Sequence, residues 1–287
     1  MITGAMKFFK RQVVRADNNY QATATHGVGH YPALIDEDYR TTGFIESISS
    51  QNQDSINVNI TYLAGVEIPE KISRIILLDH NLKKFRFWGF NASPLVGTDI
   101  DNAPFQSQIL GANSNNAVEV SGNDKTISYF EFPETTFRKH FTIQAFETIV
   151  PGELRKIGKV ILTNEIGTLI GYPEPGQMSF NPNSRTFKSK AGGAFITKQK
   201  ETLSLGLNFR NYTYEDDIEL MHKLNVMDED FLMWPCGGRE ENFRYPMKGF
   251  RVNDIYKVNT TRPIRTQYLR GSYAGLINAT MDFQETA

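Results

Sequence analysis

The stretch LSLGLNF, residues 203 to 209, places an apolar side chain at every second position. Successive side chains of a β-strand point to opposite faces of the sheet, so this spacing predicts a strand with one buried face. The same alternation recurs in Ile56–Tyr62 and Ile277–Phe283. Three runs are apolar almost throughout and fit strands buried on both faces: Ile72–Leu78, Ile157–Leu162 and Phe231–Trp234.

Turn-forming residues separate these runs. Gly, Pro, Asn and Ser gather at 121–124, 171–176, 181–183 and 191–193. Many short strands divided by turns predict an all-β protein made of β-sandwiches, here two jelly-roll-like domains. We place the boundary near Val150-Pro151-Gly152, which gives domains 1–150 and 151–287.

The first 20 residues allow two interpretations. This segment contains the apolar residues Phe8, Phe9, Val13 and Val14. They form either the first strand of domain one or an arm that lies on a neighbouring subunit.

Only one stretch predicts a helix, near residues 214–226. Thr213 suits the N-cap. Acidic residues at 215–217 suit the first turn because their negative charge interacts favourably with the positive end of the helix dipole. Ile218, Met221 and Leu224 then recur at helical spacing. We expect a short helix that plugs one end of the second sandwich, with Asp216 and Asp217 on its solvated face.

Composition excludes several classes of protein. The 287 residues carry 31 Lys and Arg against 32 Asp and Glu, a net charge of −1 that does not favour nucleic-acid binding. The single cysteine, Cys236, rules out an intramolecular disulfide framework and a cysteine-built zinc site. We find no signal-peptide core and no apolar run long enough for a membrane span. We therefore expect synthesis in the cytoplasm and no membrane insertion.

Two groups of residues around histidines are candidate sites. His26 and His30, with Asp36 and Asp38 nearby, could hold a metal, but their spacing matches no closed zinc pattern and favours a polar loop. His80 follows Asp79 directly, and neighbouring residues at a strand end point apart. This pair therefore predicts a strand-to-loop junction held by side-chain hydrogen bonds rather than an acid–base pair.

No catalytic set emerges from the sequence. Cys236 lacks the local signature of a cysteine nucleophile, and no Gly-x-Ser-x-Gly elbow is present. A glycan hydrolase would need two carboxylates brought together in space, for which Glu131, Glu134 and Asp254 are candidates. We predict a protein that is not an enzyme and has no cofactor or metal.

A late basic and aromatic stretch is the candidate interface. Its residues are Arg262, Arg265, Tyr268, Arg270 and Tyr273. Arg and Tyr are favoured at interfaces because they combine area with directional hydrogen bonds. Solvated strand residues would have the same pattern, so both interpretations stay open.

Several segments resemble, in their order along the chain, a known arrangement of two β-sandwiches. The first half carries YPALIDEDYRTT at 31–42, IILLDHNL at 75–82 and a closing strand at 137–143. These are similar to a discoidin-like, galactose-binding-type β-sandwich. The second half carries KIGKVIL at 156–162, the alternating strand, the helix and a closing strand at 273–284. These resemble the tail-type β-sandwich that follows a discoidin-like one in phage and prophage tail proteins.

The sequence departs from the pattern of these proteins at two places. Gly43-Phe44-Ile45 stands where such sandwiches usually have Trp, and Asp79 stands in place of Gly. The resemblance implies a structural subunit of a phage tail or baseplate, placed in the virion as a symmetric ring or collar. Its partners would be further copies of itself and other tail proteins.

The alternative is a module that binds carbohydrate on a host surface. It would need a cluster of aromatic and polar loops at one end of a sandwich. Residues 26–31 with Phe85, Phe87 and Trp88 are the candidates, although alternation favours a core strand.

Overall fold

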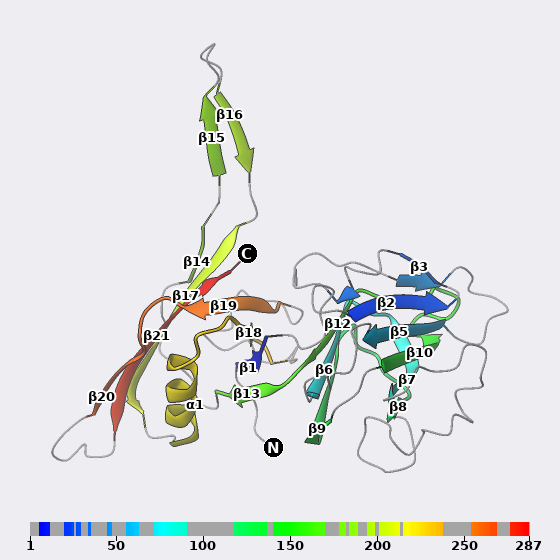
Figure 1. Ribbon diagram of the computed structural model, residues 1–287, viewed down its shortest axis with the longest axis horizontal. Helices are drawn as coiled ribbons and strands as arrows, with labels where there is room; N and C mark the ends of the chain where they lie inside the picture. Colours follow the sequence, from blue (N-terminus) through cyan, green and yellow to red (C-terminus); the bar gives the residue numbers. More distant parts are fainter. Residues whose placement is uncertain are drawn as a thin grey trace. The chain divides into compact units, whose positions relative to one another are not determined.

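The computed structural model describes residues 6–11, 20–25, 27–29, 34–35, 45–47, 56–62, 72–90, 118–136, 140–169, 178–181, 184–188, 194–198, 201–212, 215–237, 254–268 and 276–286. The chain forms two compact units (Figure 1). Lys10–Glu165 form one, here the sandwich unit. Met1–Phe9 and Ile166–Ala287 form the other, here the helix unit.

The sandwich unit is built on two main sheets. The larger has the order β2 (Tyr20–Thr25), β5 (Ile56–Tyr62), β10 (His140–Thr148), β7 (Leu82–Phe90) and β8 (Val118–Val120). The smaller has the order β12 (Lys159–Thr163), β6 (Ile72–Leu78) and β9 (Ser128–Thr136). A third sheet joins β11 (Lys156–Ile157), β4 (Ile45–Ser47) and β3 (Gly27–Gly29).

One hydrophobic core joins the sheets of this unit. Val58 and Ile143 from the larger sheet belong to the same buried cluster as Ile75 and Leu162 from the smaller one. Both β6 and β12 are buried almost along their whole length, as their largely apolar runs predicted. Two sheets that share one core make this unit a β-sandwich.

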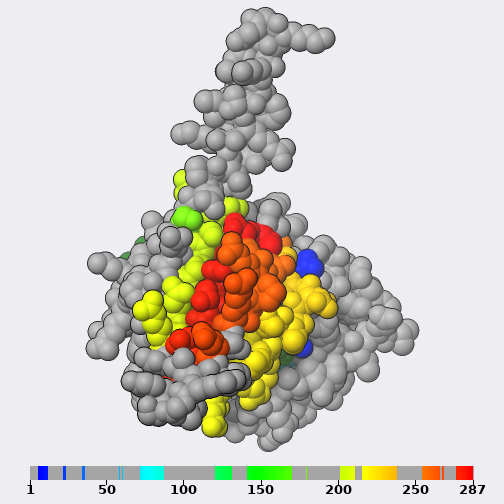
Figure 2. Space-filling view, turned by 90° about the vertical axis from the view of Figure 1, so that its left-hand side faces the viewer, coloured from blue at the N-terminus to red at the C-terminus, as the bar shows by residue number. Residues whose placement is uncertain are grey.

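The helix unit has one eight-stranded sheet. Its order is β13 (Glu165–Thr168), β1 (Lys7–Lys10), β18 (Phe231–Trp234), β19 (Tyr256–Thr260), β21 (Ile277–Glu285), β17 (Thr202–Tyr212) and β14 (Met178–Asn181). β20 (Arg265–Tyr268) also pairs with β21. Figure 2 shows β17, β21 and the β19–β20 segment side by side on one face.

This sheet curls around its own core. Phe8 on β1 and Phe283 on β21 have ring centroids 5.6 Å apart. Two strands lie between β1 and β21, which would put them about 14 Å apart in a flat sheet. The sheet is therefore strongly curved, which brings side chains from strands three places apart into one core.

The helix α1 (Glu215–Asn225) closes this core. Leu220, Met221 and Leu224 are buried in the same cluster as Phe209 and Met281. Asp217 is also fully buried, so the expectation that it lies on a solvated face was wrong. The reason is its spacing, because positions 217, 220, 221 and 224 share one face of a helix.

A hairpin of two strands follows β14. β15 (Ser184–Lys188) pairs antiparallel with β16 (Ala194–Lys198), and Phe187 lies opposite Phe195. The pair forms a sheet of its own, which no other described strand joins. In Figure 1 it lies beyond the ends of β14 and β17.

The expected all-β class with one short helix is confirmed. The division of the chain differs from the one expected at 150/151. Residues 149–153 form a turn inside the sandwich unit, and Phe8 and Phe9 are fully buried in a strand of the helix unit's sheet. Phe8 and Phe9 therefore form a strand, as the first of the two alternatives expected, but the strand belongs to the helix unit and not to the first domain. Val13 and Val14 lie outside the described residues.

Candidate functional site

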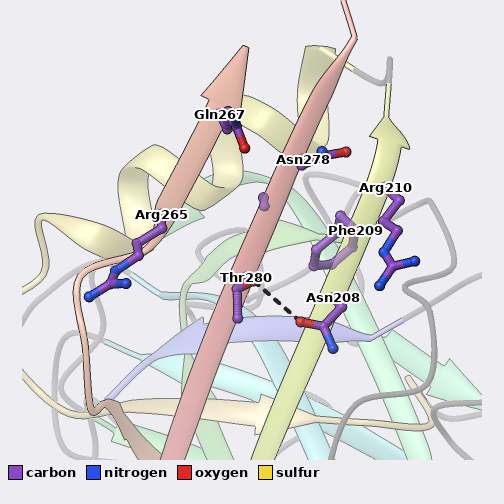
Figure 3. Close-up of a pocket in the computed structure, with 8 residues that line it drawn as sticks. Asn208, Phe209, Arg210, Arg265, Gln267, Asn278 and Thr280 are labelled. Atoms are coloured by element: carbon purple, nitrogen blue, oxygen red, sulfur yellow. Dashed lines mark hydrogen bonds between the residues drawn. The ribbon is translucent and has the colours of Figure 1, made fainter. Parts of the chain in front are cut away.

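The strands β17, β21 and β20 build a polar groove on the outer face of the curled sheet (Figure 3). Leu207 and Phe209 on β17 and Ala279 on β21 are buried on the core side. Side chains alternate along each strand, so the intervening residues lie on the outer face. The polar positions of strands with one apolar face thus form the site.

The strand register brings these residues together. Thr280 on β21 lies opposite Asn208 on β17 and opposite Arg265 on β20. Asn278 lies opposite Gln267 in the next row of the sheet. The Thr280 hydroxyl donates to Asn208 Oδ1 at 3.3 Å, which ties two of the strands together on this face (Figure 3).

The groove offers mainly hydrogen-bond donors. It has a volume of about 430 Å³ and its lining includes two guanidinium groups, Arg210 and Arg265, both exposed. Three carboxamides and one hydroxyl complete its polar surface: Asn208, Gln267, Asn278 and Thr280. Carboxylates and other acceptor-rich groups suit such a surface, because Arg binds them through paired N–H donors.

Catalysis has no support in this groove. Among the described residues that line it, none is acidic, His or Cys. Among these described residues, the Thr280 hydroxyl is a possible nucleophile, and none of the usual general bases lies beside it in the lining. The arrangement suits recognition of a partner.

One predicted interface residue lies in the groove. Arg265 contributes to its lining, and Arg262 is exposed in the bend after β19. Tyr268 ends β20, while Arg270 and Tyr273 lie outside the described residues. Five of the lining residues were not predicted as site residues: Asn208, Arg210, Gln267, Asn278 and Thr280. In the sequence they appear only as the polar positions of alternating strands. These positions form a site because the strand register places three strands side by side.

His80 belongs to a structural junction, as its position after Asp79 predicted. The His80 ring is buried, and its Nδ1 accepts a hydrogen bond from the Leu82 N–H at 3.2 Å. Its Nε2 therefore carries the proton and lies 2.9 Å from Ser128 Oγ. Burial lowers the pKa of His80 to about 4, which keeps the ring neutral.

Asn81 completes this junction. Its Nδ2 donates to the Leu154 carbonyl and its Oδ1 accepts from the Lys156 N–H, both at 2.8 Å. The neighbouring Asp79 has a φ of 51°, in the left-handed region that Asp tolerates better than most residues. These contacts hold the chain where it leaves one sheet of the sandwich and enters the other.

Cys236 is a buried thiol in the turn after β18. Burial and the nearby Asp254 carboxylate raise its pKa to about 12. A thiol held in its protonated form is a poor nucleophile. The structure therefore gives Cys236 a packing role.

The other sequence candidates do not form a described site. Glu131 lies on β9 of the sandwich unit and Asp254 in the helix unit. His26, His30, Asp36 and Asp38 lie outside the described residues, and the described ones hold no cluster of potential metal ligands. Phe85 is fully buried against His80 and Phe130, as alternation favoured. In the part of the chain that is described, no helix has the length and apolarity needed to cross a membrane.

No protein-family model matches the chain, and no curated protein matches it. Among solved structures, it is similar to a family 32 carbohydrate-binding module of Clostridium perfringens NanJ in complex with galactose. The identity is 12%, the coverage 55% of this chain and 98% of that chain, and the TM-score 0.36. A chitosan-binding module from Paenibacillus sp. IK-5 shows 14% identity, coverage of 53% and 98%, and a TM-score of 0.37. Such values define neither a family nor a ligand for this chain.

Proposed function

We propose that the chain is a structural subunit that assembles in several copies, as in a phage tail or baseplate. The observation that carries the proposal is the β15–β16 hairpin, a two-stranded sheet that no other described strand joins. An isolated two-stranded sheet is marginally stable in water, and its open edges are ready to pair. A neighbouring subunit would supply the missing contacts.

The groove on β17, β20 and β21 supports the same role. Its exposed Arg210 and Arg265 and its carboxamides offer hydrogen-bond donors to a protein surface. Arginine is enriched at protein interfaces. The order of the segments that resemble tail proteins also agrees with this role.

Quantitative mass spectrometry of purified extracellular particles tests the proposal. We expect this chain at a fixed ratio to the major capsid protein, in a few to a dozen copies per particle. Absence of the chain from intact particles would contradict it.

Substitution in the groove tests its part in assembly. Replacing both Arg210 and Arg265 by Ala should weaken self-association about tenfold or more, because two guanidinium contacts are lost. Light scattering during size-exclusion chromatography would measure the mass of the assembly. Arg262→Ala is the matched control, since Arg262 is exposed but does not line the groove. Equal effects of all these changes would remove the groove from the interface.

A second candidate function is carbohydrate binding by the sandwich unit. The unit has a hydrophobic core of its own and is inserted between two strands, β1 and β13, that are neighbours in the helix unit's sheet. An inserted domain of this kind can carry a binding activity without interrupting the sheet that holds it. A glycan array that includes galactose, probed with the full chain, tests this role. The absence of any retained glycan would exclude it for the glycans displayed.

A further inference from the structure

The β15–β16 hairpin lies in a basic segment of an almost neutral chain. Residues 184–200 contain five Lys and Arg and no Asp or Glu: Arg185, Lys188, Lys190, Lys198 and Lys200. The whole chain has a net charge of −1. Acidic residues must therefore predominate elsewhere.

The strongest acidic surface among the described residues lies on α1 and on the link from α1 to β18. Five carboxylates are exposed there: Glu215, Asp216, Glu219, Asp228 and Glu229. Residues 215–230 contain one basic residue of the Lys or Arg type, the exposed Lys223. Its Nζ lies 2.7 Å from Glu219 Oε1. Val226, which is 74% exposed, adds an apolar side chain to this surface.

The two charged segments lie at opposite ends of β17. β16 ends at Lys198, just before β17 begins at Thr202. α1 begins at Glu215, just after β17 ends at Tyr212. Eleven residues of extended strand span about 36 Å, so the hairpin of one copy lies far from the α1 of that same copy.

We propose that the hairpin of one copy docks along α1 of the next copy, head to tail. This inference rests on the proposed multi-copy assembly and names the partner of the hairpin. The two elements also match in length. Five-residue strands span about 17 Å, and an eleven-residue helix spans about 16 Å.

Such a contact joins two different surfaces, one from each copy. A heterologous interface of this kind closes into a ring if its rotation closes, and otherwise grows into a filament. Individual surface ion pairs are weak, but complementary potentials orient the partners and set their register. The assembly should therefore weaken as salt is raised, because exposed charges are screened.

Reciprocal charge reversal tests the proposal. The hairpin variant carries Arg185→Glu, Lys188→Glu and Lys198→Glu. The helix variant carries Glu219→Lys, Asp228→Lys and Glu229→Lys, which leaves the acidic first turn of α1 unchanged. We expect each variant alone to associate at least tenfold more weakly than wild type, measured by light scattering during size-exclusion chromatography.

An equimolar mixture of the two variants should restore assembly. Each acidic hairpin would then meet a basic helix, and each basic hairpin an acidic helix, in alternating copies. A mixture that stays as weakly associated as its components would overturn the proposal, as would a helix variant that assembles like wild type. If wild type assembles and no variant changes it, this inference fails while the structural role stands. A wild-type chain that stays monomeric and is absent from particles contradicts both.

A second measurement does not depend on the variants folding. Isotopically labelled and unlabelled wild-type chains are mixed, treated with a zero-length carbodiimide cross-linker and analysed by mass spectrometry. We expect links from Lys188 or Lys198 to Glu219 or Glu229 that join labelled to unlabelled copies. The absence of such mixed links would overturn the proposal. Retention of an oligonucleotide by wild type but not by the hairpin variant, without mixed links, would instead identify nucleic acid as the partner.

Discussion

Individual residues at the junction between β6 and β7 explain how the sandwich changes sheets. His80 and Asn81 together bond to the backbone of three other segments, with donor–acceptor distances of 2.8 to 3.3 Å. The sequence predicted a junction here because Asp, His and Asn directly follow an apolar strand. The partners of these side chains were not predictable, since Thr126, Leu154 and Lys156 lie more than forty residues further along the chain.

The buried His80 predicts a pH dependence of stability. Its folded pKa of about 4 lies below the ordinary value of 6.5, so the unfolded chain binds this proton more tightly. The stabilisation is complete above pH 6.5 and is lost as the pH falls toward 4. We expect a loss of up to about 3 kcal/mol in the free energy of unfolding over this range.

Urea unfolding at several pH values measures this effect. His80→Gln should remove this part of the pH dependence, whereas His222→Gln should keep it, because His222 is exposed on α1. A His80→Gln protein with the wild-type pH dependence would show that another group is responsible.

The type and the buried face of single elements were predicted better than the partners of each strand in its sheet. The alternation in β17 and β21 and the helical spacing in α1 predicted both the type of each element and its buried face. A strand at Phe8 and Phe9 was one of the two alternatives, but its place was unexpected, because its neighbours β13 and β18 are far away in sequence. Its two adjacent phenylalanines are both fully buried within this chain, whereas an arm that reached a neighbouring subunit would leave them exposed here.

Replacing Phe8 by Ala tests the place of β1 in the helix unit. The ring lies 5.6 Å from that of Phe283 and 6.0 Å from that of Phe231, so its loss leaves a cavity. We expect this unit to lose about 3–5 kcal/mol of stability, with little change in the sandwich unit. Hydrogen exchange of β21 compared with β10 measures both effects. Lys10→Ala is the control, because Lys10 is exposed at the end of the same strand. Equal loss of protection in both units would contradict this assignment.

The whole chain is arranged as an insertion. The chain leaves the helix unit's sheet after β1, forms the sandwich unit and returns at β13. β1 and β13 are neighbours in that sheet. The Lys10 N–H donates to the Asn164 carbonyl at 2.8 Å, and the Thr163 hydroxyl donates to the Lys10 carbonyl at 2.7 Å. The two ends of the insert are therefore adjacent, which is the geometry that tolerates domain insertion.

Excision of the insert tests this arrangement. Residues 12–162 are replaced by a short Gly/Ser linker, which keeps β1, β13 and the bonds between the two ends of the insert. We expect a folded protein with one cooperative thermal transition and the circular dichroism of a β-sheet with one helix. Residues 151–287 alone are the comparison, and they should fail to fold because they lack β1. If 151–287 fold as well as the excised chain, β1 is dispensable.

The sequence alone determined the all-β class, the single helix, the doubly buried strands and the core positions of the alternating ones. Each of these follows from local spacing, because strands and helices have different side-chain periods. Only the tertiary structure decided which unit owns β1, where the sandwich is inserted, and that Asn208, Thr280 and Arg265 share one row. These features depend on pairing between distant strands. A period of two residues fixes which face of a strand is buried, but it does not choose the neighbour.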